Sequence, residues 1–493
     1  MKRILDSVHG YIEIPKEYCK AIVDTEYFQR LRRVEQTSTR SIFPSARHDR
    51  FIHSLGVFHL GTKFIKTLRR QFDKEGVQKP DNLDKVFESY LLACLLHDVA
   101  HSPFSHTFED YYTSKYSDTA GVLSQLVGNE VFEKDWEKFP DRSASHERMS
   151  AIVALGVFGE FIDSRGADRE LVARMIIGLY YNIDRPDHSF ENAMIDLIHG
   201  DVIDADGLDY VCRDAWASGY STTRVDVDRL TESVCIVPDK TGIYHLCFTE
   251  KCLNEIDSVL TVKNFQQYYV INHHTVTYEQ ALLVKAMESA AVYHIYGKTN
   301  VDDPEMREDA LKRLCDLKSF YNIEGAPGIK TPHTGVDIYL PMDDDFIALM
   351  KPVRNDVYVN QWLSRQYKLQ ALWKSKAEFY QTFNRLKDIP LKKGNWLFRD
   401  ECREHISNVF GIPMEMIWTR KATPKYKGNF ADKVEIIVNG DIIPYSKLFP
   451  KDVNSYEPQK SEFYYIYVPR EANRQAILEM LQKEYTKFFI NQD

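Results

Sequence analysis

The sequence has no apolar run long enough to cross a membrane. Its apolar stretches, such as residues 90–96, fall far short of the roughly 20 residues that a membrane-spanning helix needs. The first ten residues, MKRILDSVHG, pass directly into charged and polar positions, so we expect no signal peptide. These absences favour a cytoplasmic protein with no membrane partner.

The sequence also lacks paired cysteines and an excess of basic residues. Its eight cysteines are scattered and form no CxxC pair. This pattern favours reduced, partly buried thiols over a disulfide framework. The 63 Lys and Arg residues stand against 72 Asp and Glu residues, and the net charge of -9 argues against a general nucleic-acid-binding surface.

The first 320 or so residues are predicted to be mainly helical. Apolar residues recur at helix-like spacing in residues 21–36, 83–98, 147–158, 169–182 and 254–270. Asn82 is the expected N-cap of the second of these helices. A strand pair at 233–237 and 242–248 interrupts the helices. A hydrophobic content of 44% is ample for a substantial core.

The composition changes after residue 322, where residues 324–335 are rich in Gly, Pro and Thr. Asn439 and Gly440 then predict a hairpin turn between two apolar strands. A strand at 462–469 and a helix at 470–489 follow. We therefore expect a helical core with an extension in residues 1–322, and a smaller α+β region in residues 323–493.

The pair His97 and Asp98 is the most informative feature of the sequence, because it ends an apolar run. Desolvating groups this polar is unfavourable unless they have partners. An imidazole beside a carboxylate is a natural ligand pair for a divalent metal, although a single His-Asp dipeptide is weak evidence. His53 and Asp206 would complete a site of two histidines and two carboxylates. Such a metal would neutralise phosphate charge and activate water.

Three more histidines, His101, His106 and His146, accompany these motifs. Imidazoles near a metal suit proton transfer and phosphate contact. A helix-capping role for His146, next to Ser145, stays open as an alternative.

The order of the motifs, with RFIHSLGV, LLHDVAHSPFSHTFE and DADGLDYVCRD, resembles the HD-domain phosphohydrolase superfamily. The chain is most similar to its deoxynucleoside triphosphate triphosphohydrolase branch, which includes SAMHD-type enzymes and bacterial dNTPases. The resemblance begins at VHGYIEIPKEYCKAIVDTEYFQRLRRVEQ and extends to about Ser289. It covers more than half of the chain, and this combination of motifs is highly specific.

The resemblance implies a role for each matching residue. The implied metal ligands are His53, His97, Asp98 and Asp206. The implied catalytic and phosphate-facing residues are His101, His106, His146 and Arg50, with His146 as proton donor to the leaving group and a nearby carboxylate orienting it. The residues implied to contact the sugar are Gln36, Tyr210 and Asp214. Asp24, Gln29 and Arg32 match a guanine-nucleotide activator site, although a salt-bridged helix face would also explain them.

The sequence departs from the family pattern at three places. Thr37 and Ser38 replace a Leu-Gly pair beside the sugar, and Gly207 stands where a Lys or Arg is common. Thr277 or a neighbour stands where a phosphate-facing arginine is common. His274, which we assign to substrate binding, or His273 or Lys285, would have to compensate.

We therefore expect a phosphohydrolase that depends on a divalent metal, which could be Mn, Mg, Fe, Co, Ni or Zn. It would cleave (deoxy)nucleoside triphosphates at the α-phosphorus, giving nucleoside and triphosphate. The alternatives are an HD phosphohydrolase acting on ribonucleotides, monophosphates or cyclic or signalling nucleotides, and a catalytically idle nucleotide sensor in an antiviral defence assembly. The expected partners are a nucleotide substrate, a guanine-nucleotide activator and further copies of the chain in a dimer or tetramer.

Overall fold

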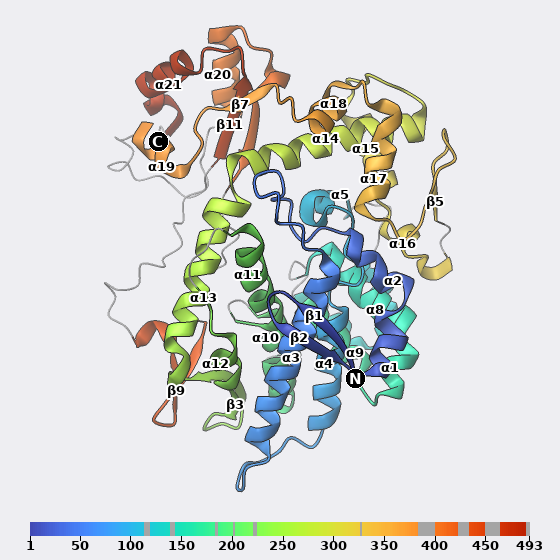
Figure 1. Ribbon diagram of the computed structural model, residues 1–493, viewed down its shortest axis with the longest axis vertical. Helices are drawn as coiled ribbons and strands as arrows, with labels where there is room; N and C mark the ends of the chain where they lie inside the picture. Colours follow the sequence, from blue (N-terminus) through green and yellow to red (C-terminus); the bar gives the residue numbers. More distant parts are fainter. Residues whose placement is uncertain are drawn as a thin grey trace.

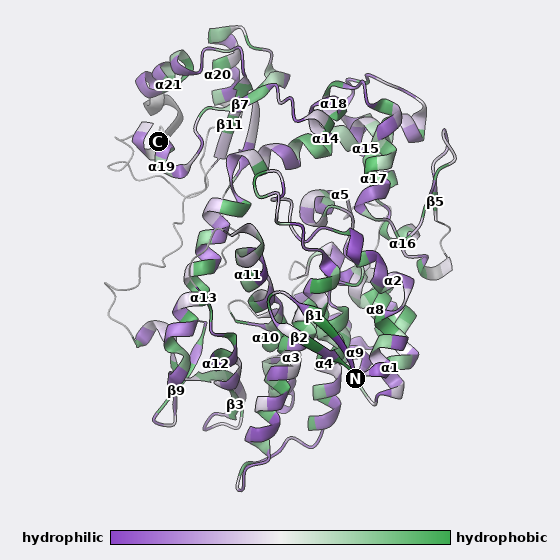
Figure 2. Cartoon of the chain, viewed as in Figure 1, coloured by the Kyte–Doolittle hydropathy of each residue, from purple (hydrophilic) through white to green (hydrophobic). Residues whose placement is uncertain are grey.

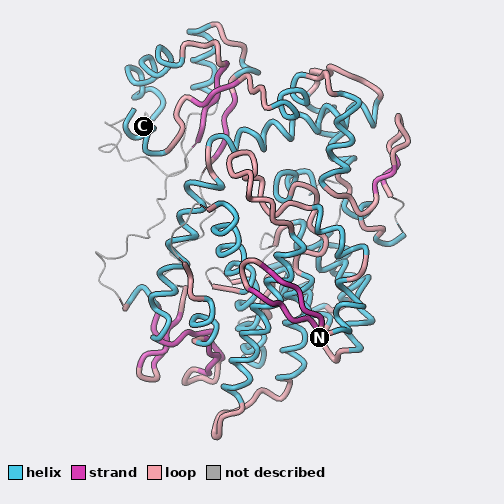
Figure 3. The backbone as a smooth tube through the Cα atoms, viewed as in Figure 1, coloured by secondary structure: helices cyan, strands magenta, loops and turns pink. Residues whose placement is uncertain are grey.

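Helices form most of the computed structural model, as the sequence predicts, and the strands lie in small sheets (Figure 3). The structure describes residues 1–112, 119–138, 143–182, 186–200, 203–219, 224–325, 328–382, 400–422, 433–448 and 464–489. Many helices carry hydrophilic and hydrophobic stretches in alternation, as expected for helices with one buried face (Figure 2). In the described part of the chain, no helix is both long and apolar enough to span a membrane.

The candidate site is built on a bundle of helices in the first half of the chain (Figure 1). These helices are α3 (Arg50–Phe72), α4 (Leu83–Leu96), α8 (Ser145–Ser164), α9 (Arg169–Ile177), α10 (Ser189–His199) and α11 (Ala205–Ser218). Helix α4 packs against α3, α8, α9 and α10, and its residues Leu92–Leu96 are fully buried. An apolar helix of this kind forms the centre of a bundle, which explains the apolar run that precedes His97.

Shorter elements surround this bundle. In the first 260 residues they are β1 (Lys2–Asp6), β2 (Gly10–Ile14), α1 (Lys16–Tyr18), η1 (Cys19–Val23), α2 (Glu26–Gln29), η2 (Arg30–Arg33), η3 (Ser105–Phe108), α5 (Glu109–Tyr112), α6 (Thr119–Val127), α7 (Glu130–Lys138), η4 (Pro186–His188), α12 (Val227–Glu232), β3 (Val234–Pro238), β4 (Tyr244–Thr249) and η5 (Glu250–Cys252). The predicted hairpin is therefore present as β3 and β4. The predicted helix over residues 21–36 is wrong as one element, because π-helical, α-helical and 3₁₀ turns share this segment.

Polar side chains begin the helices that carry the site. Asp49 accepts a hydrogen bond from the backbone of Ile52 at the start of α3, and Asp204 accepts one from Gly207 at the start of α11. Each bond satisfies a backbone N–H that has no partner within the helix. Asn82 precedes α4 as predicted, but it does not cap the helix, because its side chain donates instead to Glu191 at 2.7 Å.

The second half of the chain continues with α13 (Leu253–Gln266), η6 (Gln267–Ile271), α14 (His274–Tyr296), α15 (Pro304–Leu314), α16 (Leu317–Phe320), η7 (Ile323–Gly325), β5 (Ile329–Lys330), β6 (Asp337–Ile338), α17 (Asp343–Met350), η8 (Lys351–Val353), α18 (Val357–Ser364), β7 (Leu369–Ala371), α19 (Lys376–Thr382), α20 (Asp400–Phe410), η10 (Met414–Met416), β8 (Trp418–Lys421), β9 (Glu435–Val438), β10 (Asp441–Pro444), η12 (Tyr445–Lys447), β11 (Tyr464–Pro469) and α21 (Arg474–Phe489). The predicted C-terminal hairpin, strand and helix correspond to β9–β10, β11 and α21. Residues 462 and 463 of the predicted strand lie outside the described residues.

The C-terminal strands divide between two sheets. Strand β11 lies between β7 and β8 in an antiparallel three-stranded sheet. Hairpin β9–β10 leaves this region and joins β4, to which β9 runs parallel, in a sheet of order β10-β9-β4-β3. In Figure 1, β9 lies in the lower part of the molecule, in the same sheet as β3 and well away from β11.

The hydrophobic packing does not follow the boundary that we expected at residue 322. The main core includes Phe346 and Val359, and β9 adds Ile436 to it. A second, smaller core joins residues 369–481 to Tyr278 and Leu282 of α14. Much of the expected C-terminal region therefore belongs to the same core as the first helices.

Substitution of Ile436 by Ala tests this attachment. Its side chain is fully buried in the main core, so we expect the free energy of unfolding to fall by about 2–5 kcal/mol. Val409→Ala, at a position that is 52% exposed on α20, is the control and should change it little. Urea denaturation followed by circular dichroism measures both, and an unchanged midpoint for Ile436→Ala would contradict the parallel pairing.

Candidate active site

The four predicted metal ligands converge at the ends of three helices. His53 lies in the first turn of α3, His97 and Asp98 follow α4, and Asp206 lies in the first turn of α11. Nε2 of His53 is 3.3 Å from Nε2 of His97, 3.0 Å from Oδ1 of Asp206 and 3.7 Å from Oδ2 of Asp98. His53, His97 and Asp206 therefore offer ligand atoms within reach of one ion, and Asp98 lies beside them with its Oδ2 bound to Arg50.

Hydrogen bonds behind the two imidazoles make their Nε2 atoms available as ligands. Nδ1 of His53 lies 2.7 Å from Oδ2 of Asp209, and Nδ1 of His97 lies 3.0 Å from the carbonyl oxygen of Cys94. Both partners are acceptors, so each Nδ1 donates a proton to its partner, and the two Nε2 atoms face each other at the point where the carboxylates meet. Metal-binding histidines are oriented in this way.

The charge around these imidazoles favours a cation. Burial lowers the pKa of His53, but hydrogen bonds to Asp206 and Asp209 outweigh it and raise the pKa to about 10. Burial raises the pKa of Asp98, but the Arg50 guanidinium at 2.5 Å outweighs this and holds the pKa well below its usual range. The raised pKa of His53 and the low pKa of Asp98 both reflect a pocket whose carboxylates stabilise positive charge. This mixed nitrogen and oxygen donor set fits a divalent transition metal.

Asp209 orients the metal ligands and was missed as a functional residue by the sequence analysis. Its fully buried carboxylate accepts hydrogen bonds from Nδ1 of His53, from Nε2 of His9 at 2.7 Å, and from Nε and Nη2 of Arg213, each at 2.8 Å. Arg213 also donates to both oxygens of Asp6, at 2.8 and 3.2 Å. The N-terminal hairpin is tied to the metal ligands through this network. Only the spacing between Asp209 and Arg213, one helical turn apart, was a signal in the sequence.

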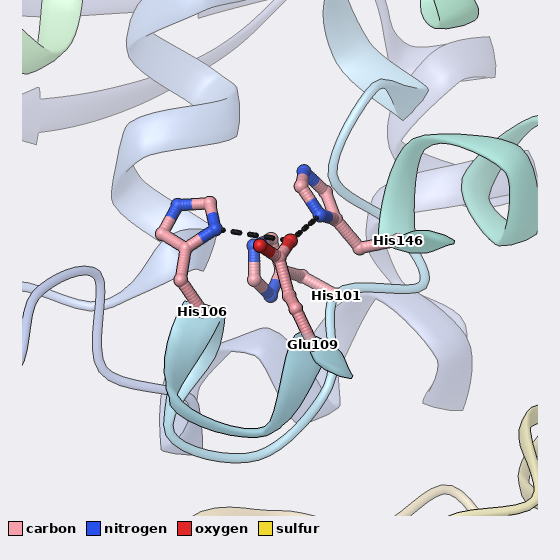
Figure 4. Close-up of side chains that lie close together, drawn as sticks. All are labelled: His101, His106, Glu109 and His146. Carbon is pink, nitrogen blue, oxygen red and sulfur yellow. Dashed lines mark hydrogen bonds and ion pairs between the residues drawn. The ribbon is translucent and has the colours of Figure 1, made fainter. Parts of the chain in front are cut away.

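The predicted catalytic histidines form a second cluster beside the metal ligands (Figure 4). The rings of His101 and His146 stack at 4.1 Å, and His106 contacts both edge-on, at 5.1 and 5.2 Å. Glu109 lies between them: Oε1 accepts from Nδ1 of His146 and lies 3.1 Å from Nδ1 of His106. Glu109 is therefore the carboxylate that orients His146, and sequence reasoning did not identify it.

The members of this cluster differ in protonation. Burial lowers the pKa of His146, but the hydrogen bond to Glu109 outweighs burial and raises it. Burial and the nearby Arg50 guanidinium hold the pKa of His101 well below its usual range. His146 is thus the ring best suited to hold a proton, while the stacked His101 stays neutral. This difference is what a general acid requires.

Both clusters line one cavity of about 1110 Å³. Of the predicted residues, the lining includes Gln36, Arg50, His97, Asp98, His106, His146, Asp206, Tyr210 and Asp214. His53 and His101 lie buried behind this wall. A cavity of this volume is large enough for a nucleotide.

Most of the residues assigned to the sugar and the phosphates line the cavity, but His274 does not. Gln36, Tyr210 and Asp214 line the cavity, and Asp214 is held by Nε2 of His48 at 2.7 Å. His274 does not belong to this lining, because its Nδ1 faces the carbonyl oxygen of Lys374 at 3.0 Å, so we remove it from the substrate-binding set. Thr277 does line the cavity, with its hydroxyl 2.7 Å from the Tyr467 hydroxyl.

The predicted activator residues do not belong to the lining of this cavity. Arg32 donates to the side chain of Gln29 at 2.9 Å and stacks on Phe51, with its guanidinium carbon 3.5 Å from the ring centre. Asp24 is exposed and pairs with Lys2 at 3.0 Å. Gln29 and Arg32 thus contact each other near α2 and η2, whereas Asp24 contacts Lys2 of strand β1.

Comparison with known proteins agrees with this geometry. The HD-domain profile matches residues 50–209, which contain both clusters. Residues 50–209 of the chain therefore form an HD domain. The HD domain here begins with α3 and ends in α11, so all four candidate metal ligands lie within it.

The relatives of this HD domain are distant. The chain is 32% identical over 261 residues to the deoxynucleoside triphosphate triphosphohydrolase SAMHD1 homolog of Dictyostelium discoideum, covering 51% of this chain and 42% of that one. It is 27% identical over 296 residues to the uncharacterized protein YwfO of Bacillus subtilis, covering 59% and 56%. The chain thus spans about half the length of the curated relatives it matches. The crystal structure of a Bacteroides thetaiotaomicron phosphohydrolase shares the fold, with a TM-score of 0.63, 20% identity and coverage of 96% of this chain and all of that one.

Gly56 offers a test of the Asp209 network without changing any candidate ligand. A Cβ atom at Gly56 would lie 1.9 Å from Oδ1 of Asp209 and 2.6 Å from Nη2 of Arg213, so Asp209 would have to move. Because His53 depends on this carboxylate, we expect Gly56→Ala to lower metal affinity by about 10- to 100-fold. Gly156→Ala in α8, where a Cβ meets no atom within 4 Å, is the matched control. Elemental analysis after dialysis measures the effect, and equal metal content in both variants would rule out the proposed orienting role.

Proposed function

We propose that this protein hydrolyses phosphate esters of nucleotides with a bound divalent metal. The observation that carries the proposal is the convergence of two sites on one cavity: a two-histidine, two-carboxylate cluster and a His146–Glu109 pair. When bound, the metal would neutralise phosphate charge and lower the pKa of water. The chain's own residues would supply the positioning and the proton.

His146 is proposed to protonate the leaving oxygen. Its Nδ1 is bound to Glu109, so the proton to be transferred resides on Nε2. Glu109 holds the ring in place and stabilises its protonated form, and the neutral His101 stacked behind it excludes water from that face. A positioned imidazole of this kind contributes general acid catalysis.

The proposed substrate is a (deoxy)nucleoside triphosphate, cleaved at the α-phosphorus to nucleoside and triphosphate. Two features support it: the similarity to SAMHD1-type triphosphohydrolases, and a cavity that has room for a nucleotide. Gln36, Tyr210 and Asp214 are proposed to contact the sugar. Arg50 and His106 are proposed to face the phosphates, with Arg50 anchored on Asp98.

A guanine-nucleotide activator and a homo-oligomer are proposed on a narrower basis. Asp24, Gln29 and Arg32 lie within residues 24–32, where Arg32 contacts Gln29, and an aspartate can accept two hydrogen bonds from a guanine edge. Binding there would favour an assembled state in proportion to its differential affinity for that state.

A nucleotide panel tests the proposed reaction. With Mn²⁺ or Mg²⁺, with and without GTP, we expect the purified chain to release triphosphate and nucleoside, identified by mass spectrometry. Asp206→Ala removes an anionic ligand, so its metal content should fall well below one per chain and hydrolysis should stop. Asp228→Ala, which removes an exposed partner of Lys63, is the control.

The products released in the nucleotide panel distinguish between the three candidate functions. Release of monophosphate alone, or hydrolysis only of cyclic or ribonucleotides, would replace the triphosphohydrolase with another HD phosphohydrolase. Nucleotide binding without hydrolysis under any metal would favour the idle sensor instead.

The pH dependence of turnover tests the acid. Because Glu109 raises the pKa of His146, Glu109→Gln should lower that pKa, and the basic limb of the pH–rate profile should move to lower pH. His146→Ala should reduce turnover by about 100-fold or more at pH values below the basic limb, where His146 holds its proton. Glu160→Gln, at an exposed position on the same helix, is the control. An unchanged basic limb in Glu109→Gln would mean that His146 is not the acid.

A further inference from the structure

Two basic residues of the C-terminal sheet reach the cavity. Arg420 and Lys421 end strand β8, and both line the cavity wall together with residues of the HD domain. Strand β8 pairs with β11, whose Tyr467 contacts Thr277 at the same wall. The three-stranded sheet therefore contributes a wall to a cavity whose metal ligands lie more than 200 positions earlier in the chain.

Arg420 lines the same cavity as helix α5, which begins with Glu109. The charged and titratable groups that act on its guanidinium are Tyr467, Tyr111, Glu288 and Asp110. Tyr111 and Asp110 belong to α5 and also line the cavity. Arg420 and the proposed acid His146 thus belong to the wall of one cavity.

The charge of Arg420 is not balanced by a dedicated carboxylate in the described structure. Glu288, the buried acid among these groups, is already bound by Lys285 at 3.0 Å and by Arg307 at 3.1 Å. Among the described residues, Nε of Arg420 is buried and has no hydrogen-bond partner. A buried guanidinium N–H without an acceptor is unfavourable unless a ligand supplies one.

Two other basic side chains of the cavity, Arg50 and Lys285, are already paired with carboxylates. Arg50 is bound to Asp98 and Lys285 to Glu288. Gly207 and Thr277 add no charge where a phosphate-facing cation is common in the superfamily. Arginine presents a planar fork of donors that suits phosphate oxygens.

We propose that Arg420 binds the phosphate groups of the substrate that extend beyond the metal centre, so that the C-terminal sheet selects for polyphosphate. This inference rests on the proposed function for the identity of the substrate. It replaces His274 as the source of the missing phosphate-facing charge, and it gives the C-terminal region a direct part in the substrate site.

Calorimetry with inorganic triphosphate tests the inference independently of hydrolysis. We expect Arg420→Ala to weaken binding of triphosphate by about 10- to 100-fold, the effect of losing a charge-assisted hydrogen bond. Arg420→Lys should bind triphosphate with an affinity between those of the wild type and Arg420→Ala. Lysine keeps the positive charge but lacks the planar fork of donors. Binding of inorganic monophosphate should change little. For nucleoside triphosphates, KM should rise more than kcat falls.

Arg470→Ala is the matched control, because Arg470 is exposed at the end of β11 and does not line the cavity. Thermal melting of each variant separates a binding defect from a folding defect, and Arg420→Lys serves if Arg420→Ala does not fold. Triphosphate binding equal to that of the wild type in Arg420→Ala, an equal loss in Arg470→Ala, or no binding by the wild type would overturn the inference. If triphosphate binds through Arg420 but no nucleotide is hydrolysed, the proposed function fails and the assignment of Arg420 stands.

Discussion

The buried carboxylate of Asp209 is the interaction on which the candidate site depends. It accepts hydrogen bonds from two imidazoles and from a guanidinium, and all of these groups are shielded from water. Removing any one donor would leave negative charge uncompensated in the interior, which is far more costly than losing a surface contact. The network therefore sets the orientation of His53, the position of α11 relative to α3 and the attachment of the N-terminal hairpin at once. The close approach that this requires is possible because residue 56 is glycine.

The parts of the fold that follow from local spacing were predicted from the sequence. Helix α4 and the C-terminal hairpin are examples, because apolar periodicity and an Asn-Gly turn are properties of neighbouring residues. The structure of residues 21–36 was harder to predict. Their apolar spacing suits one helix, but in the folded protein they form a succession of short π-helical, α-helical and 3₁₀ turns. Asn82 shows the same limit: its position matches a cap, but a buried glutamate 109 positions away takes its side chain.

The residues of the candidate site were likewise predicted only in part from the sequence. His53, His97, Asp98 and Asp206 were proposed from residue chemistry and motif order, and the structure brings them together. Glu109 was missed because a carboxylate three residues after a histidine is common on any helix, and only the fold places it against His146. Arg420 was missed because nothing near it in the sequence relates β8 to a cavity lined by the first helices. Convergence over such separations is a property of tertiary structure.

The parallel pairing of β9 with β4 has a consequence for how the chain is made. His245 on β4 and Glu435 on β9 are 190 positions apart and lie 3.0 Å from each other. During synthesis, one edge of β4 stays unpaired until β9 has emerged, and contacts of such long range form late. An exposed strand edge is open to pairing with other chains. The protein therefore passes through a stage in which its first helices are complete but a sheet edge is uncovered, and hairpin β9–β10 later covers that edge.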